Sequence, residues 1–206
     1  MALNNYSALK TAVGSWLARS DLSTAITDFI TLAEAEFNRR LRTRNMETIN
    51  SSFTIDGELV SLPSGLLEVR SFFIDSDPRR RLEYVTADVL AGIWGGSDTG
   101  TPTHYSIVGS QFRFAPAPDD DYTGNLTYYA EISALSDSNT TNWLLTSHPG
   151  AYLFGALRQA APYIRDDERV ALWEAKYEAE IASIERADSR KAFAGPLVIR
   201  PDIDIV

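Results

Sequence analysis

The chain has 206 residues, 44% of them hydrophobic, a formal charge of −9 and no cysteine. This length can bury a core in one body or in two lobes. The acidic balance argues against a general nucleic-acid binder, which needs a basic surface, but it permits a surface past which DNA slides. Without cysteine there are no disulfides, thiolate zinc sites, iron–sulfur clusters or cysteine nucleophiles.

The N-terminal residues lack the basic segment and apolar run of a signal peptide. No window approaches the roughly 18 consecutive apolar residues of a membrane span. We therefore expect a soluble protein, made in a cytoplasm, with no membrane partner.

Two helices are predicted at the N-terminus. Ser20 and Asp21 interrupt the helical pattern of the first and offer caps for the second. The apolar stripe of the second helix is Ile26, Phe29, Ile30, Ala33, Phe37 and Leu41. Near its C-terminal end, where cations favour the helix dipole, lie Arg39, Arg40, Arg42 and Arg44.

From about residue 47 the apolar period becomes that of strands. The pair Asp56-Gly57 between two alternating segments predicts a hairpin, and Gly109-Ser110 predicts another tight turn. Thr86 could cap a short helix that runs through Trp94. Further strands are predicted at 66–74, 80–84, 103–108, 111–115 and 122–132.

The helical period returns at Asn142. His148 and Pro149 supply a helix start, and the few polar residues that follow predict a central helix. A last amphipathic helix begins at Asp166 and Asp167. The predicted fold class is α+β: a four-helix bundle from residues 1–46 and 142–191, an inserted antiparallel β-rich domain over 47–141, sandwich or barrel-like, and an extended C-terminal arm over 192–206.

The arm is apolar and interrupted by prolines. Pro196 and Pro201 forbid a continuous helix, and the alternating residues would give one apolar edge if the segment paired as a strand. Such an arm could reach about 50 Å. Its candidate docking residues are Phe193, Pro196, Leu197, Val198, Ile199, Ile203, Ile205 and Val206. The alternative is a frayed terminus.

No catalytic signature is present, so we expect no enzyme and no cofactor. His104 and His148 are not paired with other metal-ligand types, and His148 next to Pro149 is typical of a helix start. Gly95–Gly100 lacks the lysine of a phosphate-binding loop. Asp119–Asp121 lacks the spacing of a calcium loop, so a solvated loop is favoured. Paired carboxylates that converge only in space stay open.

Two arginine clusters could contact an acidic neighbour or DNA phosphate, because guanidinium groups suit both. For Arg39, Arg40, Arg42 and Arg44, such a contact and a plain helix end with solvated charges stand about equal. For Arg79–Arg81, a turn with solvated charges is favoured.

The segment Leu135–Leu157, which contains Trp143-Leu-Leu-Thr-Ser-His-Pro-Gly150, resembles the adaptor proteins of tailed bacteriophages. The likeness extends through Arg165–Glu174, the early stretch Leu32–Arg42 and the ending Phe193–Ile199. These adaptors are head–tail connectors of the kind that includes the podovirus tail tubular proteins.

The resemblance implies a helical bundle with an inserted β-lobe, copied into a ring, commonly of twelve, beneath the portal in the neck of the virion. The arm would dock on the portal protein, and the β-lobe would face the next tail or nozzle component. In this picture Arg39, Arg40, Arg42 and Arg44 would lie at or near a contact with a second subunit or with the portal. DNA would pass through the lumen without specific binding, which suits an acidic chain. Synthesis and assembly would take place in the bacterial host cytoplasm.

Two alternatives remain open. One is a receptor- or glycan-binding tail module, because exposed aromatic side chains stack on ligands; strand packing explains the same residues equally well. The aromatics concerned are Trp94, Tyr105, Tyr122, Tyr128 and Tyr129. The other is a carboxylate-dependent hydrolase, for which the sequence supplies only scattered acidic residues.

Overall fold

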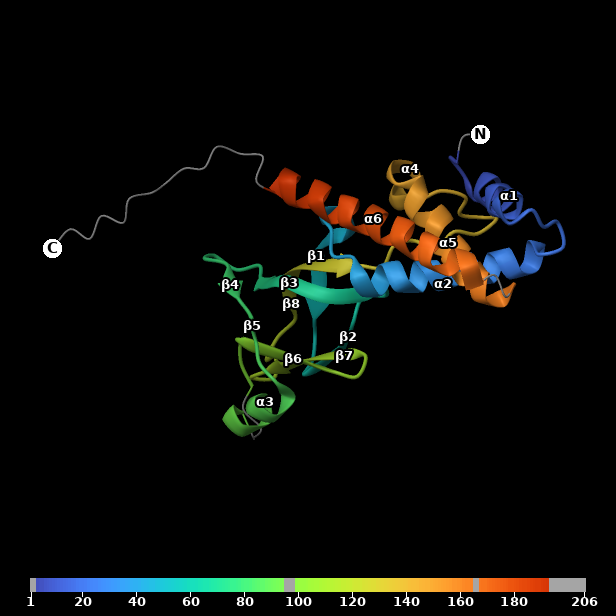
Figure 1. The fold of residues 1–206 in the computed structure, drawn as a ribbon. Coiled ribbons are helices and arrows are strands. Elements are labelled where there is room, and N and C mark those ends of the chain that lie inside the picture. Colours follow the sequence, from blue (N-terminus) through green and yellow to red (C-terminus); the bar gives the residue numbers. More distant parts are fainter. Residues whose placement is uncertain (1–2, 95–98, 165–166, 193–206) are drawn as a thin grey trace. The chain divides into compact units, whose positions relative to one another are not determined.

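The computed structural model describes residues 3–94, 99–164 and 167–192. It divides the chain into two compact units, Met1–Asn45 with Ile132–Val206 and Met46–Glu131 (Figure 1). We call them the helical unit and the β unit. The α+β class predicted from the sequence is confirmed, since helices make up the first unit and two sheets dominate the second.

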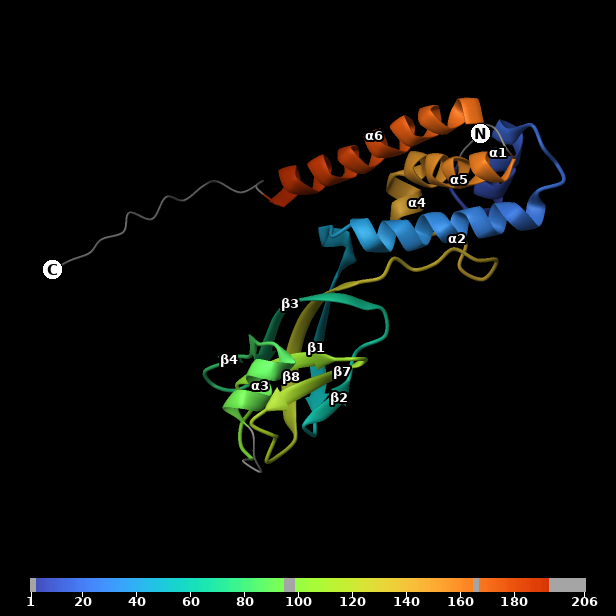
Figure 2. The same cartoon turned by 60° about the horizontal axis from the view of Figure 1, so that its bottom comes forward.

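The helical unit is organised around α5 (Pro149–Tyr163), which packs against the other four helices of the unit. These helices are α1 (Tyr6–Leu17), α2 (Ser23–Arg40), α4 (Trp143–Ser147) and α6 (Asp167–Ala192). Figure 2 shows α2, α5 and α6 running alongside one another. The predicted central position of α5 is confirmed, and Tyr152 and Leu157 on this helix are fully buried.

The four long helices expected from the sequence are present, and α4 is an addition. Their arrangement as a four-helix bundle remains a prediction. Close approach of α5 to α2 depends on Gly155, where a Cβ atom would lie 3.1 Å from that of Ala33. A side chain at this position would push the two helices apart.

The predicted cap of α2 is wrong. The residue before the helix is Leu22, which makes no side-chain capping bond. Asp21 instead pairs with Arg19 at 2.6 Å, so its carboxylate is directed toward a guanidinium and not toward the helix N-terminus. The first helix does have a side-chain cap, because Asn5 accepts a hydrogen bond from the backbone N–H of Ala8.

The β unit holds two four-stranded sheets. The first has the order β1 (Glu47–Ile55), β8 (Tyr122–Ala130), β3 (Leu66–Ile74) and β4 (Arg80–Arg81). The second has the order β2 (Leu59–Ser61), β7 (Gln111–Ala115), β6 (His104–Val108) and β5 (Glu83–Tyr84). A short helix, α3 (Ala87–Ile93), follows β5, and Thr86 precedes it without a side-chain capping bond.

Two strand predictions need correction. Asp56-Gly57 does not make a hairpin, because β1 pairs with β8 and β2 pairs with β7, in different sheets. The expected strand 80–84 is two short strands that belong to different sheets, and β5 pairs with β6 in parallel, so the β-rich region is not wholly antiparallel. The turn at Gly109-Ser110 is confirmed: it joins β6 to β7, and Gly109 has φ 60°.

The two sheets share one aromatic core. The ring of Phe72 on β3 lies 5.3 Å from that of Phe112 on β7 and 5.5 Å from that of Tyr105 on β6. A Cβ atom at Gly124 on β8 would lie 2.7 Å from the Phe72 ring, so this position requires glycine for packing. Burial of large rings on the inner faces stabilises the β unit.

Residues 132–141 contain no strand, and their backbone bonds to α2. The side chain of Asn38 accepts a hydrogen bond from the N–H of Ile132 at 2.9 Å, and that of Glu34 accepts one from Leu135 at 2.8 Å. The segment therefore belongs with the helical unit.

Candidate functional site

The four arginines predicted as a contact surface lie at and just beyond the C-terminal end of α2, but they do different things. Arg42 donates to the carbonyl oxygens of Asn38 and Leu41, at 2.8 and 2.6 Å, and so satisfies acceptors at the helix end. Arg44 lies beside Asp188 of α6, with 3.0 Å from its backbone nitrogen to Oδ1. Both therefore support the local structure.

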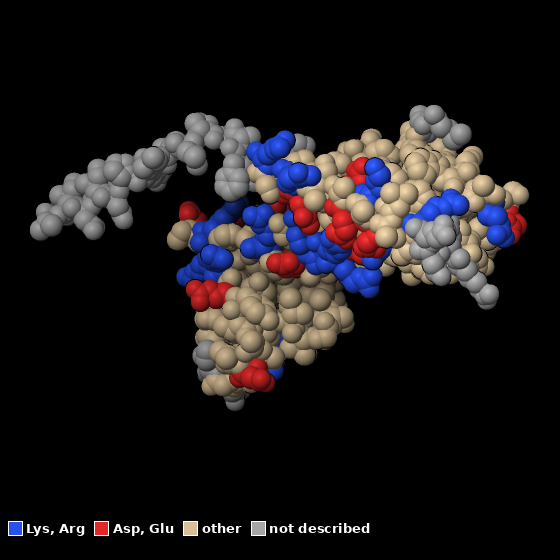
Figure 3. All heavy atoms as spheres, in the orientation of Figure 1, with Lys and Arg blue, Asp and Glu red and all other residues tan. Residues whose placement is uncertain are grey.

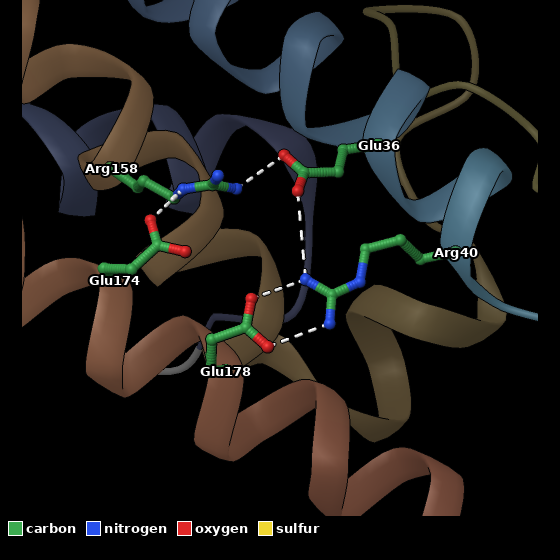
Figure 4. A network of polar contacts seen from close by, with 5 residues as sticks. All are labelled: Glu36, Arg40, Arg158, Glu174 and Glu178. Carbon is green, nitrogen blue, oxygen red and sulfur yellow. Dashed lines mark hydrogen bonds and ion pairs between the residues drawn. The ribbon is translucent and has the colours of Figure 1, made fainter.

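Arg40 is held in an ion-pair network on the surface of the helical unit (Figure 4). Its guanidinium donates to both carboxylate oxygens of Glu178 on α6, the second at 2.8 Å. It also lies 3.9 Å from Glu36, one turn back on α2. This bidentate geometry is the strong form of an arginine–carboxylate pair.

The network continues to α5 through Arg158. This guanidinium pairs with Glu36 at 2.6 Å and with Glu174 on α6. Five charged groups thus join three helices, as the dashed contacts of Figure 4 show. Charges of both signs intermingle over α2 and α6 on the face in Figure 3, so this surface is not a one-sign patch.

Beneath the network lies the buried ring of Tyr177. The guanidinium carbons of Arg158 and Arg40 are 5.0 and 5.6 Å from the ring centroid. Burial raises the pKa of Tyr177 to about 12, and the nearby carboxylate of Glu36 adds to this effect. The hydrogen bond from Arg40 lowers the pKa of Glu178. The arrangement therefore favours a charged Glu178 carboxylate and a neutral Tyr177 phenol, as expected for a structural cluster.

Arg39 differs from its neighbours. It is exposed, and within the described residues it has no ion pair or hydrogen bond. Of the four arginines it is the one whose guanidinium can reach a partner without first breaking a contact inside the chain.

The candidate docking residues of the arm, Phe193 to Val206, lie outside the described residues. The last helix, α6, extends to Ala192, so the first residue of the predicted extended arm is helical. Near the C-terminal end of this helix, Asp188 contacts Arg44 in the segment that follows α2.

The remaining predicted sites show no shared centre. His148 precedes α5 and Pro149 opens it, as predicted, but the His148 side chain makes no capping bond. His104 lies 3.7 Å from Glu83, and Asp119 accepts a hydrogen bond from Tyr122 at 2.6 Å. Among the residues that the structure describes, no group of three or more His, Asp or Glu is arranged to hold a metal ion.

Within the described residues, the other predicted clusters also form no shared site. Arg79 pairs with Asp75, and Arg80 and Arg81 form the exposed strand β4. Most of the loop Gly95–Gly100 lies outside the described residues. Tyr105 and Tyr128, two of the aromatics considered for ligand stacking, are buried in the core.

Sequence reasoning missed the acidic half of the network. Glu36 and Arg40 have the spacing of a helical ion pair, which was a readable signal. Glu174, Glu178 and Arg158 gave none, because only the packing of α5 and α6 against α2 brings them together. The exposed Tyr84 on β5 was also missed.

The model of the SU10 adaptor protein family matches residues 4–200, and the chain belongs to this family. The family supports a structural role as a bacteriophage adaptor and a location in the virion. A search of curated proteins gave no match. None of the helices in the described ranges is both long and apolar enough to cross a bilayer.

Proposed function

We propose that this protein joins the portal to the tail of a bacteriophage as a ring of twelve copies around the DNA channel, in the manner of tail tubular proteins. The observation that carries the proposal is the family match over residues 4–200. In this assembly the arm docks on the portal, and the β unit faces the next tail or nozzle component. Assembly takes place in the host cytoplasm.

The composition of the arm supports portal docking. Residues 193–206 include seven large apolar side chains, among them Phe193, Leu197 and Ile203. Strand addition would bury them while main-chain hydrogen bonds supply affinity. Arg39 is placed to add a charged contact with a neighbouring subunit or the portal, because it is exposed and has no described ion pair.

The experiment is to mix the purified protein with the portal encoded beside it and to measure the mass of the complex. The full chain is compared with a version that ends at Lys191. A ring-sized complex that forms only with the full chain supports a connector function and assigns portal binding to the arm. Binding by both versions assigns the contact to the helical unit, and binding by neither overturns the proposal.

Point variants of the full chain sharpen this test. Ile203→Asp with Ile205→Asp places charges on the apolar edge of the arm, and we expect at least tenfold weaker portal binding. Asp202→Asn with Asp204→Asn is the matched control on the opposite edge and should bind as the unmodified chain does. Equal binding by both variants would remove the strand-like arm from the proposal.

The glycan-binding alternative has less support. Tyr105 and Tyr128 are buried, and the ring of Trp94 lies 4.6 Å from that of His104. Among the described residues of the β unit, Tyr84 is the exposed aromatic, whereas Tyr122 and Tyr129 are half-buried, and one exposed ring is a small platform for a sugar. A negative result across a glycan panel would remove this alternative.

A further inference from the structure

The first sheet of the β unit has two unpaired edges. Strand β1 pairs with β8 on one side, and no strand in the described ranges pairs with its other side. Strand β3 pairs with β8 along its length, but on the far side β4 covers only Phe73 and Ile74, and the N–H of Leu82 donates to the carbonyl oxygen of Phe72 at 2.9 Å. We call Glu47–Ile55 the β1 edge and Leu66–Ser71 the β3 edge.

The β1 edge has few of the features by which edge strands avoid association. It has nine residues, of which Glu47 alone is charged, and it contains no proline or lysine. Ile49 on this strand is 67% exposed, the highest value among the exposed large hydrophobic residues. By contrast, β4 carries two arginines, and β2 and β5 have only three and two residues. A long, nearly uncharged edge is a template for another strand.

The β3 edge has open space beside it. A cavity of about 450 Å³ is bounded on one side by Val69–Phe72 of β3 and on the other by Arg81–Tyr84, with Tyr105 completing the lining. It lies where the chain leaves the first sheet for the second. Main-chain groups of β3 can therefore be reached by an incoming strand.

The two edges match in direction and face. Both β1 and β3 run antiparallel to β8, so they run in the same direction. Ile49 and Ser71 are both register partners of Thr127, so they lie in one row on the same face of the sheet, one at each edge. Rotation of one copy onto the next can therefore bring β1 beside β3 in a parallel pair.

We propose that the β1 edge of one copy pairs with the β3 edge of the next copy, so that the first sheet continues from subunit to subunit around the ring. This inference rests on the proposed ring. Such a contact joins two different surfaces, as head-to-tail ring closure requires. Register shifts lie between Asn50 and Phe53 in β1, and between Leu66 and Glu68 and between Val69 and Ser71 in β3, so the expected ladder is short.

Cysteine cross-linking tests the pairing cleanly because the chain has no cysteine of its own. In Ile49→Cys with Ser71→Cys, the two thiols of one copy flank β8 and lie about 10 Å apart, too far for an internal disulfide. Mild oxidation of the portal-bound, full-length double variant should therefore give a ladder of covalently linked copies on a non-reducing gel. Each single variant should give dimers at most.

The control pair is Leu59→Cys with Ser71→Cys, because Leu59 is 51% exposed on the edge of the other sheet. It should give no ladder. The pair Ile49→Cys with Glu68→Cys samples the neighbouring register. If rings of the expected mass form but neither Ile49→Cys pair gives a ladder, the edge pairing is overturned while the proposed ring stands. A ladder from the control pair overturns the edge pairing too. Failure of every variant and of the unmodified chain to assemble overturns the proposed function as well.

A charge variant gives an independent reading. Ile49→Lys places a cation on the β1 edge and should lower the ring-sized fraction at least tenfold, whereas Leu59→Lys should leave it unchanged. Circular dichroism of both variants checks that the fold is kept. A normal ring from Ile49→Lys overturns the pairing.

Discussion

Glu34 on α2 and Tyr152 on α5 share a hydrogen bond of 3.0 Å in the interior of the helical unit. The same carboxylate oxygen accepts the backbone N–H of Leu135, and Asn142 donates to the Tyr152 hydroxyl at 2.6 Å. This chain of bonds fixes the irregular segment 132–142 to two helices. Burial raises the pKa of Glu34, so the site holds a carboxyl group whose charged form is disfavoured.

Removal of the Glu34 side chain should destabilise the protein. Glu34→Ala leaves two buried donors without an acceptor, and each costs about 1–3 kcal/mol. We expect the free energy of unfolding to fall by about 2–4 kcal/mol in urea denaturation. Asp28→Ala on the exposed side of the same helix is the control and should change it by less than about 0.5 kcal/mol.

The raised pKa of Glu34 predicts a pH-dependent difference between Glu34→Gln and the unmodified chain. In the unfolded chain the group titrates near its ordinary pKa of 4.5, whereas the folded pKa is higher. In the pH window between these two pKa values, the folded state binds more protons than the unfolded state. The contribution of Glu34 to the stability of the protein therefore falls as the pH rises from about 4.5 through the folded pKa. Glutamine has no such titration. The stability of Glu34→Gln relative to the unmodified chain should therefore increase with pH across this window, and a constant difference would contradict the assignment.

The Arg40 network predicts a measurable change at Glu178. Arg40→Gln should raise the pKa of Glu178 toward its ordinary value, because the hydrogen bond from Arg40 is the main cause of the depression. Because its folded pKa is depressed, Glu178 stabilises the folded state at pH values above its ordinary pKa. This contribution to stability is lost as the pH falls through the folded pKa. NMR titration of the Glu178 carboxyl carbon gives the readout. Arg39→Gln, one residue earlier, should leave that titration unchanged.

Gly124 predicts a steric effect in the core of the β unit. A Cβ atom there would lie 2.7 Å from Phe72 and 3.3 Å from Ile55, so Gly124→Ala forces core rings to move. We expect a loss of about 1–3 kcal/mol in the free energy of unfolding. Gly92→Ala on α3 is the matched control, since no atom beyond its chain neighbours and the backbone of its own helix lies within 4 Å of the added methyl group. It should be neutral or raise stability by about 0.5–1 kcal/mol, because alanine favours a helix. Equal effects of the two substitutions would contradict the packing argument.

Local pattern predicted the elements well where one period continues over many residues. The stripe that begins at Ile26 became α2, the amphipathic helix predicted from Asp166 and Asp167 became α6, and the scarcity of polar residues after Pro149 correctly predicted a central helix. Gly109-Ser110 was readable because a two-residue turn with φ 60° at the glycine depends on its own residues. The expected absence of a cofactor and the docking role of the arm remain predictions.

Strand partners were decided by tertiary structure. Asp56-Gly57 has the local chemistry of a hairpin turn, yet β1 pairs with a strand almost seventy residues later in the chain. Pairing depends on which faces bury Phe53, Phe72 and Phe112 together, and this information is spread along the whole β unit. The same holds for the Arg158 pairs, whose members gain their partners only when three helices pack.

The sequence by itself determined the α+β class, the positions of the long helices, the lack of cysteine chemistry and the resemblance to phage adaptors that the family match supports. Those features depend on composition and short-range periodicity, which act before the chain is compact. Only the tertiary structure decided the sheet order, the neutralisation of Arg40 by Glu178, the bonding of residues 132–142 to α2 and the two open edges of the first sheet. Each of these requires groups far apart in the chain to meet, and packing of the whole fold selects which groups do so.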